Sequence, residues 1–582
     1  MRRSMFEIVD LDESQRRVLD AAPQARRIVV AGPGAGKTAT SVALISEIEA
    51  ATLGAEDRQI LFLSFSRAAV KAAFDAFGSV DGDYRATISA MTLDSLAWQL
   101  TEADPGTDAL VSADFDRVVR EATSQLEARY EGEFDDVVHV IVDEAQDLAL
   151  DRRALLCAVI DRLPEDAGVT IFGDPLQSIY EFLEGLATHT RTSAWEDLLD
   201  DLRARSITTT LTLDGQYRAR RRGPRKVTAV ASKLRHAAGA DQADLLDDLV
   251  SDLTHFNLTE FAGKARDWAG STAVLVRTNA EVALVFDYLS RSGVRCGWRK
   301  SGMNRPIVAP WVAQLWSAIG GAPVSLENFR DFADSVNGVD TGWFRILHHS
   351  AGSGKTIDWR AIARVCGRAE DTSDPWFEDR GTAVQVLTIH QAKGLEFDNV
   401  AVVGARSILR PPADREPETE LLFVALSRAR DKVVVIDWEP PFTRTAGSGR
   451  LYEPHPAHDV PVRICVTPDD LRSDDQIGTD AGQAALAERA HCTDLEFELL
   501  SSGGAEWPSY RCRVAGEVVG ATTPQFGMSF ARALRMQGPS GRWPSLGSVP
   551  LDGVESTWFL GVDAKFWLRP RPFGFSDVCR ER

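Results

Sequence analysis

Residues 26–49 read RRIVVAGPGAGKTATSVALISEIE, an apolar run followed by a glycine-rich loop and a segment of helical character. The loop, AGPGAGKT, occupies residues 31–38. Its glycines allow backbone N–H groups to surround phosphate oxygens, and the N-terminus of the following helix favours negative charge. Lys37 supplies a cation for the phosphates, and the Thr38 hydroxyl is placed to bind Mg²⁺. This order of strand, loop and helix predicts a P-loop in an α/β sheet.

A second motif, VVHVIVDEAQD at residues 137–147, ends an apolar run with two carboxylates. Asp143 at a strand end is suited to hold Mg²⁺ through water, and Glu144 is suited to orient or deprotonate an attacking water. Together with the P-loop, this motif predicts a site that hydrolyses a nucleoside triphosphate.

Short apolar, β-branched runs recur along the chain and alternate with helical or polar segments, as in parallel α/β sheets. The first series comprises residues 26–32, 59–65, 137–144 and 168–174, and the second comprises residues 207–213, 272–278, 383–389, 399–405 and 432–438. The two series predict two such domains.

Composition narrows the class of protein. The 582 residues are 44% hydrophobic and carry a net charge of −20, which suits several globular domains and argues against a general nucleic-acid coat protein. The seven cysteines are widely spaced, so a metal or disulfide framework is not expected. No signal peptide and no apolar stretch of about 20 residues is present, so we expect a cytoplasmic protein with no membrane partner.

The remaining segments suggest how the chain is divided. We expect one domain over residues 1–205 with a short insertion at about 97–135, and a second over 206–440 with an insertion at about 295–380. Residues 441–480 are rich in Pro, Gly and Asp and are expected to be a linker. Residues 481–582 are expected to form a small β-rich domain. A second GKT, in AGSGKT at 351–356, lacks a convincing preceding strand, and is interpreted as a chance match or a basic loop that touches nucleic acid.

Five further motifs accompany the P-loop and the DE motif, in a fixed order. They are LDESQRRVL (11–19), GDPLQSIYEF (173–182), LDGQYR (213–218), TIHQAKGLEFDNV (388–400) and LLFVALSRAR (421–430). The set resembles the UvrD/Rep/PcrA-like group of superfamily 1 DNA helicases, over about three quarters of the chain. The resemblance implies two RecA-like P-loop NTPase domains with short insertions, in addition to the β-rich C-terminal domain.

The resemblance also implies the residues that act on ATP and Mg²⁺. Gln15 would read the adenine edge, Tyr217 would stack on the base, and Glu396 would contact the ribose. Gln177 would sense the γ-phosphate, and Arg218 and Arg428 would reach it from the second domain. The implied catalytic residues are Lys37, Asp143, Glu144, Gln177, Arg218 and Arg428. The implied nucleotide-binding residues are Gln15, Ala31, Gly32, Gly34, Ala35, Gly36, Lys37, Thr38, Ala39, Tyr217, Gly394 and Glu396, and Thr38 and Asp143 would bind the metal.

The implied nucleic-acid track consists of three aromatic and two polar residues. Tyr180 and Phe182 match an aromatic pair on which bases stack, and Phe65 matches a third aromatic in the same groove; core packing is the alternative for all three. Thr388 and His390 match residues near the strand backbone. Asp94 stands where the family has a histidine, which puts that one phosphate contact in doubt.

The function implied is an ATP-dependent helicase or translocase that moves 3′ to 5′ on single-stranded DNA, or a partial duplex, in DNA repair or defence. Because both insertions are short, translocation is better supported than processive unwinding. The alternatives are an ATP-gated nucleic-acid sensor or scaffold, for example in phage defence, and an RNA-directed helicase. The C-terminal segment mixes basic and aromatic residues, which suits nucleic-acid or protein-partner contact, or simply an arginine-rich surface.

Overall fold

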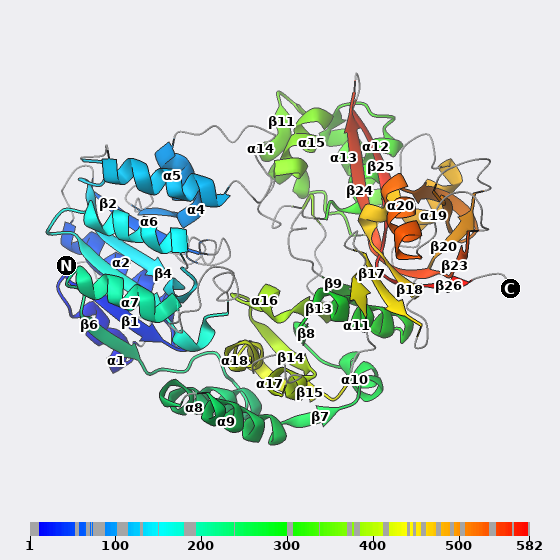
Figure 1. Ribbon diagram of the computed structural model, residues 1–582. Helices are drawn as coiled ribbons and strands as arrows, with labels where there is room; N and C mark the ends of the chain where they lie inside the picture. The colour runs from blue at the N-terminus through cyan, green and yellow to red at the C-terminus, as the bar shows by residue number, and fades with distance from the viewer. Residues whose placement is uncertain are drawn as a thin grey trace. The chain divides into compact units, whose positions relative to one another are not determined.

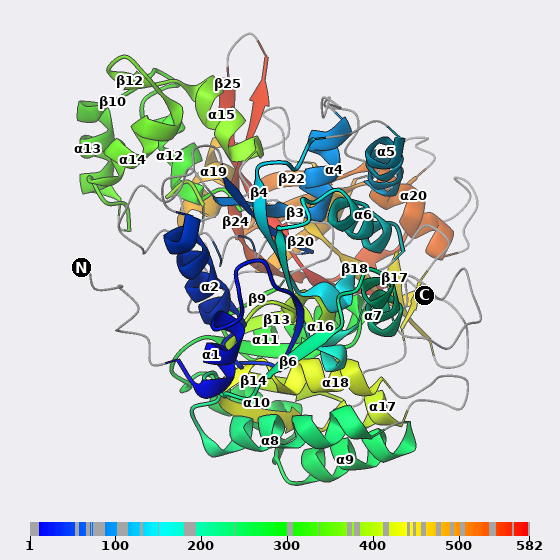
Figure 2. The same ribbon diagram turned by 90° about the vertical axis from the view of Figure 1, so that its left-hand side faces the viewer.

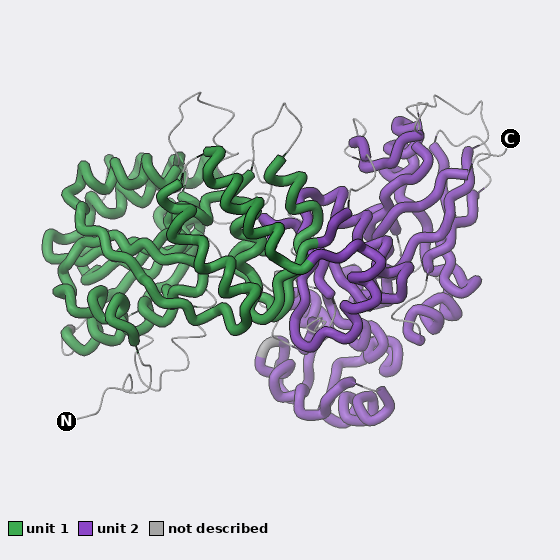
Figure 3. The backbone as a smooth tube through the Cα atoms, turned by 90° about the horizontal axis from the view of Figure 1, so that it is seen from below, with its two compact units in different colours: residues 1–254, 392–435 green, residues 255–391, 436–582 purple. Residues whose placement is uncertain are grey.

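The structure is a computed structural model that resolves into two compact units, coloured separately in Figure 3: residues 1–254 with 392–435 (unit 1), and residues 255–391 with 436–582 (unit 2). It describes residues 11–52, 58–65, 70, 73, 88–101, 115–128, 132–148, 150–179, 194–237, 239–298, 307–336, 338–368, 375–377, 384–410, 418–438, 443–445, 450–455, 461–472, 479–488, 494–500, 507–534, 543–561 and 564–579.

A six-stranded parallel sheet forms the centre of unit 1, in the order β3-β2-β4-β5-β1-β6 (Figure 1). In chain order its strands are β1 (Arg26–Ala31), β2 (Gln59–Ser64), β3 (Ile88–Thr92), β4 (Val137–Asp143), β5 (Gly168–Gly173) and β6 (Thr209–Leu213). Five of the predicted runs are therefore strands of this sheet. One was assigned to the wrong series: β6 pairs with β1 and so completes the first sheet. It is an edge strand with largely exposed residues, which explains its mixture of threonine and leucine.

Both faces of this sheet are covered. Neighbouring residues of a strand point to opposite faces, and in β2 they pack in two different apolar clusters. Leu61 and Leu63 of β2 pack in one apolar cluster, and Ile60 and Phe62 pack in another. The first cluster is completed by α4 (Leu93–Thr101), α5 (Phe115–Ala128), α6 (Leu150–Asp161) and α7 (Ala194–Ala204). The second is completed by α1 (Glu13–Leu19) and α2 (Lys37–Thr52). The acidic insertion at 97–135 thus supplies helices that share the core of the first sheet.

The rest of unit 1 comes from two separate stretches of the chain. Its elements are α8 (Arg222–His236), α9 (Ala240–Ser251), β14 (Phe397–Val403), α17 (Ala405–Leu409), α18 (Thr419–Leu426) and β15 (Ala429–Ile436). Strands β14 and β15 are two more of the predicted apolar runs, and α18 is buried along most of its length.

Unit 2 contains the remaining predicted parallel strands. Strand β13 (Val384–Thr388) pairs in parallel with β8 (Thr272–Val276) on one side and β9 (Cys296–Trp298) on the other. The accompanying elements are β7 (Thr254–Phe256), α10 (Leu258–Ala265), α11 (Asn279–Arg291) and the short α16 (Ile389–Ala392). The chain therefore has the two parallel α/β sheets expected of two RecA-like domains.

The insertion of unit 2 is a small helical body with its own three-stranded sheet, ordered β10-β12-β11. Its elements are α12 (Pro310–Ala318), β10 (Val324–Ser325), α13 (Leu326–Ser335), α14 (Trp343–Ala351), β11 (Gly352–Ser353), β12 (Thr356–Ile357) and α15 (Trp359–Arg368). The second GKT lies in the β11–β12 hairpin, where Gly354 has φ +63° at the turn. No helix begins there, so this segment has the geometry of a hairpin turn.

The C-terminal part is antiparallel and β-rich, as predicted. One sheet has the order β16-β17-β18-β26-β23 and the other β19-β22-β21-β20-β24-β25. The strands are β16 (Arg444–Thr445), β17 (Leu451–Pro454), β18 (Pro461–Val466), β19 (Leu471–Arg472), β20 (Asp494–Leu499), β21 (Tyr510–Val514), β22 (Glu517–Thr522), β23 (Ser545–Leu546), β24 (Val549–Leu560), β25 (Ala564–Pro572) and β26 (Gly574–Cys579). Helices α19 (Asp480–Glu488) and α20 (Pro524–Ala533) accompany them.

Residues 441–480 differ from the expected linker. Strand β18 pairs with β26 near the C-terminus, and β17 pairs with β18. Ile464 and Val466 are fully buried in a cluster with Tyr510 and Phe526. The described part of the segment therefore belongs to the C-terminal sheet.

One apolar core joins the insertion to the C-terminal part. Buried residues of α12 to α15, such as Val312, Phe329 and Ile362, belong to the same cluster as Val514, Val554 and Phe566 of the C-terminal strands. The insertion and the C-terminal strands therefore form one packed body, although they are far apart in the sequence.

Candidate nucleotide-binding and catalytic site

The P-loop lies between β1 and α2, as the sequence predicts, and two of its glycines cannot be replaced without strain. Gly34 and Gly36 have φ values of +76° and +86°, which L side chains rarely adopt. A Cβ at Gly34 would lie 2.5 Å from Cβ of Arg218, and a Cβ at Gly36 would lie 2.5 Å from Nε2 of Gln15. The loop is thus fitted closely to two of the predicted ATP residues.

The predicted carboxylates lie beside the P-loop lysine. Nζ of Lys37 is 2.9 Å from Oε1 of Glu144, and Asp143 occupies the last position of β4. Burial disfavours the ammonium, but the charges of Glu144 and Asp143 outweigh it and raise the pKa of Lys37. Burial and the neighbouring Glu144 charge raise the pKa of Asp143, whereas Lys37 lowers the pKa of Glu144 against the effect of burial. Lys37 therefore stays charged while the Asp143 carboxyl is poised for a further cation.

A chain of hydrogen bonds links Glu144 to a buried arginine. Nε2 of Gln146 donates to Oε2 of Glu144 at 2.5 Å, and Oε1 of Gln146 accepts from the backbone N–H of Asp174 at 3.1 Å. Nε2 of Gln177 in turn donates to Oδ2 of Asp174 at 2.8 Å. Finally, Arg428 donates through Nη2 to Oε1 of Gln177 at 2.7 Å. Three predicted catalytic residues thus belong to one continuous polar network.

Arg428 is held in this network by its surroundings. Its side chain is fully buried at the C-terminal end of α18, and Nε donates to the carbonyl of Val424 at 3.1 Å. Burial, together with the nearby charge of Arg218, lowers the pKa of Arg428 to about 9. An anionic group beside Arg428 would therefore stabilise its charged form, as expected of an arginine that contacts a phosphate.

Lys393 lies beside the predicted catalytic residues, although the sequence analysis did not single it out. Its Nζ contacts both the carboxylate of Asp147 and the backbone carbonyl of Gln177. Burial raises the pKa of Asp147 to about 7 and lowers the pKa of Lys393. Only ten residues of the chain are Lys, and this one falls inside the motif TIHQAKGLEF, which was the available signal.

Arg218 and Glu396 contact each other. Nε of Arg218 donates to Oε1 of Glu396 at 2.7 Å, and Arg430 donates to Oε2 of the same carboxylate at 2.9 Å. Although burial opposes ionisation, the two arginines lower the pKa of Glu396. Gly394 precedes it with φ +77°. The structure thus brings the predicted ribose and γ-phosphate residues together as an ion pair.

Gln15 and Tyr217 also meet beside the P-loop. The hydroxyl of Tyr217 donates to Oδ2 of Asp12 at 2.7 Å and lies 3.2 Å from Oε1 of Gln15. Nε2 of Gln15 donates to the hydroxyl of Thr40 at 3.1 Å. Tyr217 is 54% exposed as a whole residue, which leaves it accessible for stacking. Thr38 and Ala39 are exposed at the start of α2, and Ala31 and Ala35 are buried.

The nucleic-acid residues are less completely described. Phe65 is partly buried against the core of unit 1, with the guanidinium of Arg152 5.9 Å from its ring centroid. The unexpected Asp94 pairs with this arginine at 3.0 Å, so its charge is compensated. Tyr180 and Phe182 lie outside the described residues.

Thr388 and His390 belong to unit 2, at the junction of β13 and α16. The Thr388 hydroxyl accepts from the backbone N–H of Gln391 at 3.3 Å, and Oε1 of Gln391 accepts from the backbone N–H of Thr388 at 2.9 Å. This reciprocal cap fixes the turn that carries His390, whose side chain is half-buried.

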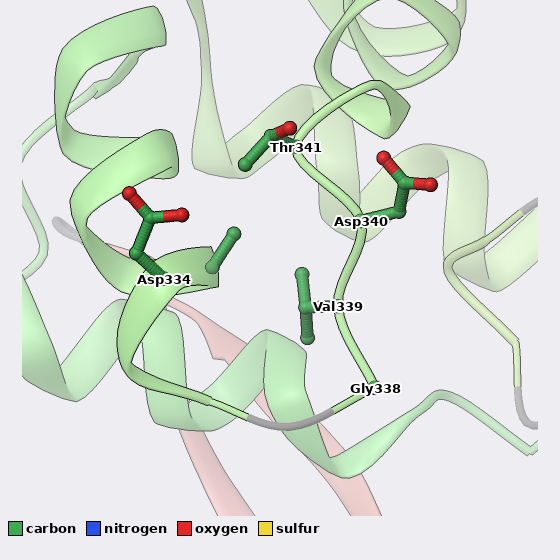
Figure 4. A pocket seen from close by; sticks show the side chains of 6 residues that line it. Asp334, Gly338, Val339, Asp340 and Thr341 are labelled. Carbon is green, nitrogen blue, oxygen red and sulfur yellow. The ribbon is translucent and has the colours of Figure 1, made fainter.

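A surface depression of about 510 Å³ occurs in the insertion (Figure 4). It is lined by Ala333, Asp334, Gly338, Val339, Asp340 and Thr341. None of the predicted site residues contributes to it.

Comparisons with known proteins agree with the position of the motifs. A family model for an AAA domain matches residues 15–183, and one for the UvrD-like helicase C-terminal domain matches residues 383–436. No curated protein matches the chain. Among the described residues, no helix is long and apolar enough to cross a membrane.

Several solved structures are similar at low identity. A Bacteroides Pif1 structure bound to single-stranded DNA is 15% identical, covers 74% of this chain and 93% of its own, and has a TM-score of 0.35. Pif1 helicase from Candida albicans is 12% identical, with shares of 74% and 96% and the same TM-score of 0.35. The DUF1998 helicase MrfA bound to DNA is 10% identical, with shares of 75% and 50% and a TM-score of 0.35.

The two family models cover the P-loop, the DE motif, Gln177 and the turn that carries Lys393 and Glu396. The chain thus contains an AAA domain and a UvrD-like helicase C-terminal domain, a combination that supports an ATP-hydrolysing helicase.

Proposed function

We propose that the protein moves along single-stranded DNA in the 3′ to 5′ direction, at the expense of ATP, and separates strands or displaces proteins in DNA repair or defence. The observation that carries the proposal is the hydrogen-bonded network from Lys37 through Glu144 and Gln177 to Arg428. It joins the P-loop to the segment matched by the UvrD-like helicase model.

Each residue of the network has a role in this proposal. Lys37 would exchange its contact with Glu144 for the β- and γ-phosphates, which frees Glu144 to orient the attacking water. Arg218 and Arg428 would stabilise charge on the transferred phosphoryl group. Gln15 and Tyr217 would hold the adenine, and Glu396 the ribose once Arg218 turns to the phosphate.

Mg²⁺ fits the donors that are present. Asp143 is a buried carboxylate whose pKa is raised by burial and by Glu144, so a divalent cation beside it would relieve both effects. The exposed Thr38 hydroxyl is a second oxygen donor. Mg²⁺ favours one or two protein oxygens together with phosphates and water. When bound, the ion would neutralise charge that develops on the phosphates.

The nucleic acid would contact Phe65, Tyr180, Phe182, Thr388 and His390, as the resemblance implies. In this proposal residues 1–205 and 206–440 are the two motor domains, except that β6 (Thr209–Leu213) belongs with the first of them. Residues 441–480 are assigned with 481–582 to the C-terminal module, since β17 and β18 are paired within it. A protein partner would bind through that module.

Two lysines of GKT sequences give a matched test. Lys37→Ala is expected to abolish ATP hydrolysis and displacement of a strand from a duplex with a 3′ single-stranded tail. Lys355→Ala changes the same sequence in the β11–β12 turn and should leave hydrolysis unchanged. Equal loss in both variants, or displacement that persists in Lys37→Ala, would refute the assignment of the P-loop.

The alternative of an ATP-gated sensor has one observation in its favour: the C-terminal module is packed on the insertion in a shared core. A sensor would bind nucleic acid in an ATP-dependent manner without displacing a strand. Deleting residues 461–582 would expose this core. The helicase and the sensor should therefore be distinguished with point variants of the C-terminal module and not with a deletion. Oligonucleotides of RNA, tested in parallel, decide whether the substrate is RNA.

A further inference from the structure

The end of the β24–β25 hairpin has two faces of different character. The register places Thr557 opposite Trp567 and Phe559 opposite Lys565. Directly opposed residues share a face and alternate residues change face, so these four side chains lie on one side of the hairpin. Trp558 and Phe566, also opposed to each other, lie on the other side.

The second of these faces is packed against the insertion. The ring of Phe566 lies 4.9 Å from Trp359 of α15 and 6.0 Å from Trp558, centroid to centroid. Nε1 of Trp316 in α12 donates to the carbonyl of Ala564 at 3.0 Å. Figures 1 and 2 show the hairpin alongside α12 and α15. The insertion therefore holds the hairpin firmly and leaves the Phe559 face pointing away.

The outward face is accessible and partly aromatic. Phe559 is 61% exposed, the largest value for a large hydrophobic side chain among the described residues. Lys565 is exposed and Trp567 is partly exposed. An exposed aromatic ring next to a lysine, with a second ring diagonally across the strand pair, is the arrangement of a stacking platform for bases.

Positive charge also lies at the end of the hairpin. Arg360 and Arg364 are exposed one turn apart on α15, and Arg360 donates to the carbonyl of Gly561 at the hairpin end, at 2.8 Å. Residues 343–368, which include α14 and α15, contain five Lys or Arg residues and a single acid. In a chain with a net charge of −20, this stretch is locally basic.

We propose that the outward face of the β24–β25 hairpin binds single-stranded nucleic acid at a site additional to the motor. Bases would stack on Phe559 and Trp567, while Lys565, Arg360 and Arg364 would neutralise the phosphates. The cations favour nucleic acid over an apolar protein partner, since a protein interface centred on Phe559 would leave three positive charges at its edge to be desolvated. Stacking does not read the sugar, so the site accepts DNA and RNA alike.

The inference rests on the proposed action on nucleic acid for its role, but its test does not depend on ATP hydrolysis. The full chain with Lys37→Ala is photo-crosslinked to oligonucleotides that contain 5-bromodeoxyuridine or 5-bromouridine, and the labelled peptides are mapped. Crosslinks are expected within residues 549–579. Adding Phe559→Ala should lower their yield roughly 5- to 150-fold, as the loss of one stacked base predicts.

Two further variants make the result decisive. Lys565→Gln keeps every ring and should also lower the yield, more so at low salt. Leu499→Ala removes another exposed hydrophobic side chain of the same module, 37% exposed, and should leave the yield unchanged. Labelling confined to peptides outside 549–579, or equal yields in Phe559→Ala and Leu499→Ala, would overturn the site. If labelling occurs at the hairpin but no nucleic acid stimulates hydrolysis by the unaltered chain, the motor proposal fails and the hairpin site stands.

Discussion

Replacing Lys393 should destabilise unit 1, because it leaves a carboxylate buried without its partner. Lys393 contacts Asp147, and the two side chains are only 7% and 3% exposed. Breaking a buried ion pair by removing one partner costs about 3–5 kcal/mol, whereas replacing both partners is often close to neutral. Lys393→Met should therefore lower the free energy of unfolding by about 3–5 kcal/mol at pH 8, and Lys393→Met with Asp147→Asn should recover most of this loss.

The assay is thermal unfolding of the purified full chain at pH 8, followed by circular dichroism, for the unaltered chain, both single variants and the double variant. With about 2–4 °C per kcal/mol for a domain of this size, the single lysine variant should melt roughly 6–20 °C lower. If the effects of the two single variants simply add in the double variant, the pair is not coupled and the reasoning is refuted. A lysine variant that melts within about 2 °C of the unaltered chain would refute it equally.

Three other changes follow from the structure. Gly34→Ala should abolish nucleotide binding in a fluorescent-nucleotide titration, because φ is +76° and the new Cβ would clash with Arg218. The control variant Gly354→Ala, in the hairpin turn, should bind the nucleotide normally. Normal binding by both variants would contradict the close fit of the P-loop. Burial lowers the pKa of His139 to about 4, so the histidine is neutral when folded and stability should fall by about 3 kcal/mol as pH drops from 6.5 towards 4. In His139→Gln, the free energy of unfolding should depend less on pH between 6.5 and 4. An unchanged dependence on pH would contradict the role given to His139. The ring centroids of Phe573 and Trp298 lie 3.6 Å apart in a stacked arrangement. Phe573→Ala should therefore lower the free energy of unfolding, measured with denaturant, by about 3–5 kcal/mol. A decrease below about 1 kcal/mol would contradict the place of Phe573 in the core.

Much of the fold could be predicted because its central strands are covered on both faces. Runs such as VVHVIVD and NVAVV are continuously apolar, and this pattern marks a buried parallel strand without reference to the rest of the chain. β3, with its half-buried ISAMT, and the three-residue β9 lack that pattern and were not predicted. β6 was recognised as a strand, but its edge position could not be read from its residues.

The C-terminal part was harder because its order depends on partners far away in the sequence. β18 is flanked by Pro and Asp, and only its pairing with β26, over 100 residues later, makes Ile464 a core residue. The core shared by Phe329 and Phe566 likewise has no local signal. Long-range packing of this kind is absent from composition and periodicity.

The candidate site was predicted residue by residue from motifs, and its contacts were not. The sequence could name Arg218 and Glu396 but could not indicate that they pair with each other. Nor could it show that Gln146 bridges Glu144 to the Asp174 loop. Lys393 was missed because its role depends on Asp147, which lies 246 residues away.

The central claim is that ATP hydrolysis at Lys37, Asp143 and Glu144 is coupled to a single strand of nucleic acid. The most direct measurement is the steady-state rate of ATP hydrolysis by the full chain with no nucleic acid, single-stranded DNA, single-stranded RNA and tailed duplex. We predict a large stimulation by single-stranded DNA that disappears in Lys37→Ala and persists in Lys355→Ala. A rate that none of these nucleic acids changes would contradict the account.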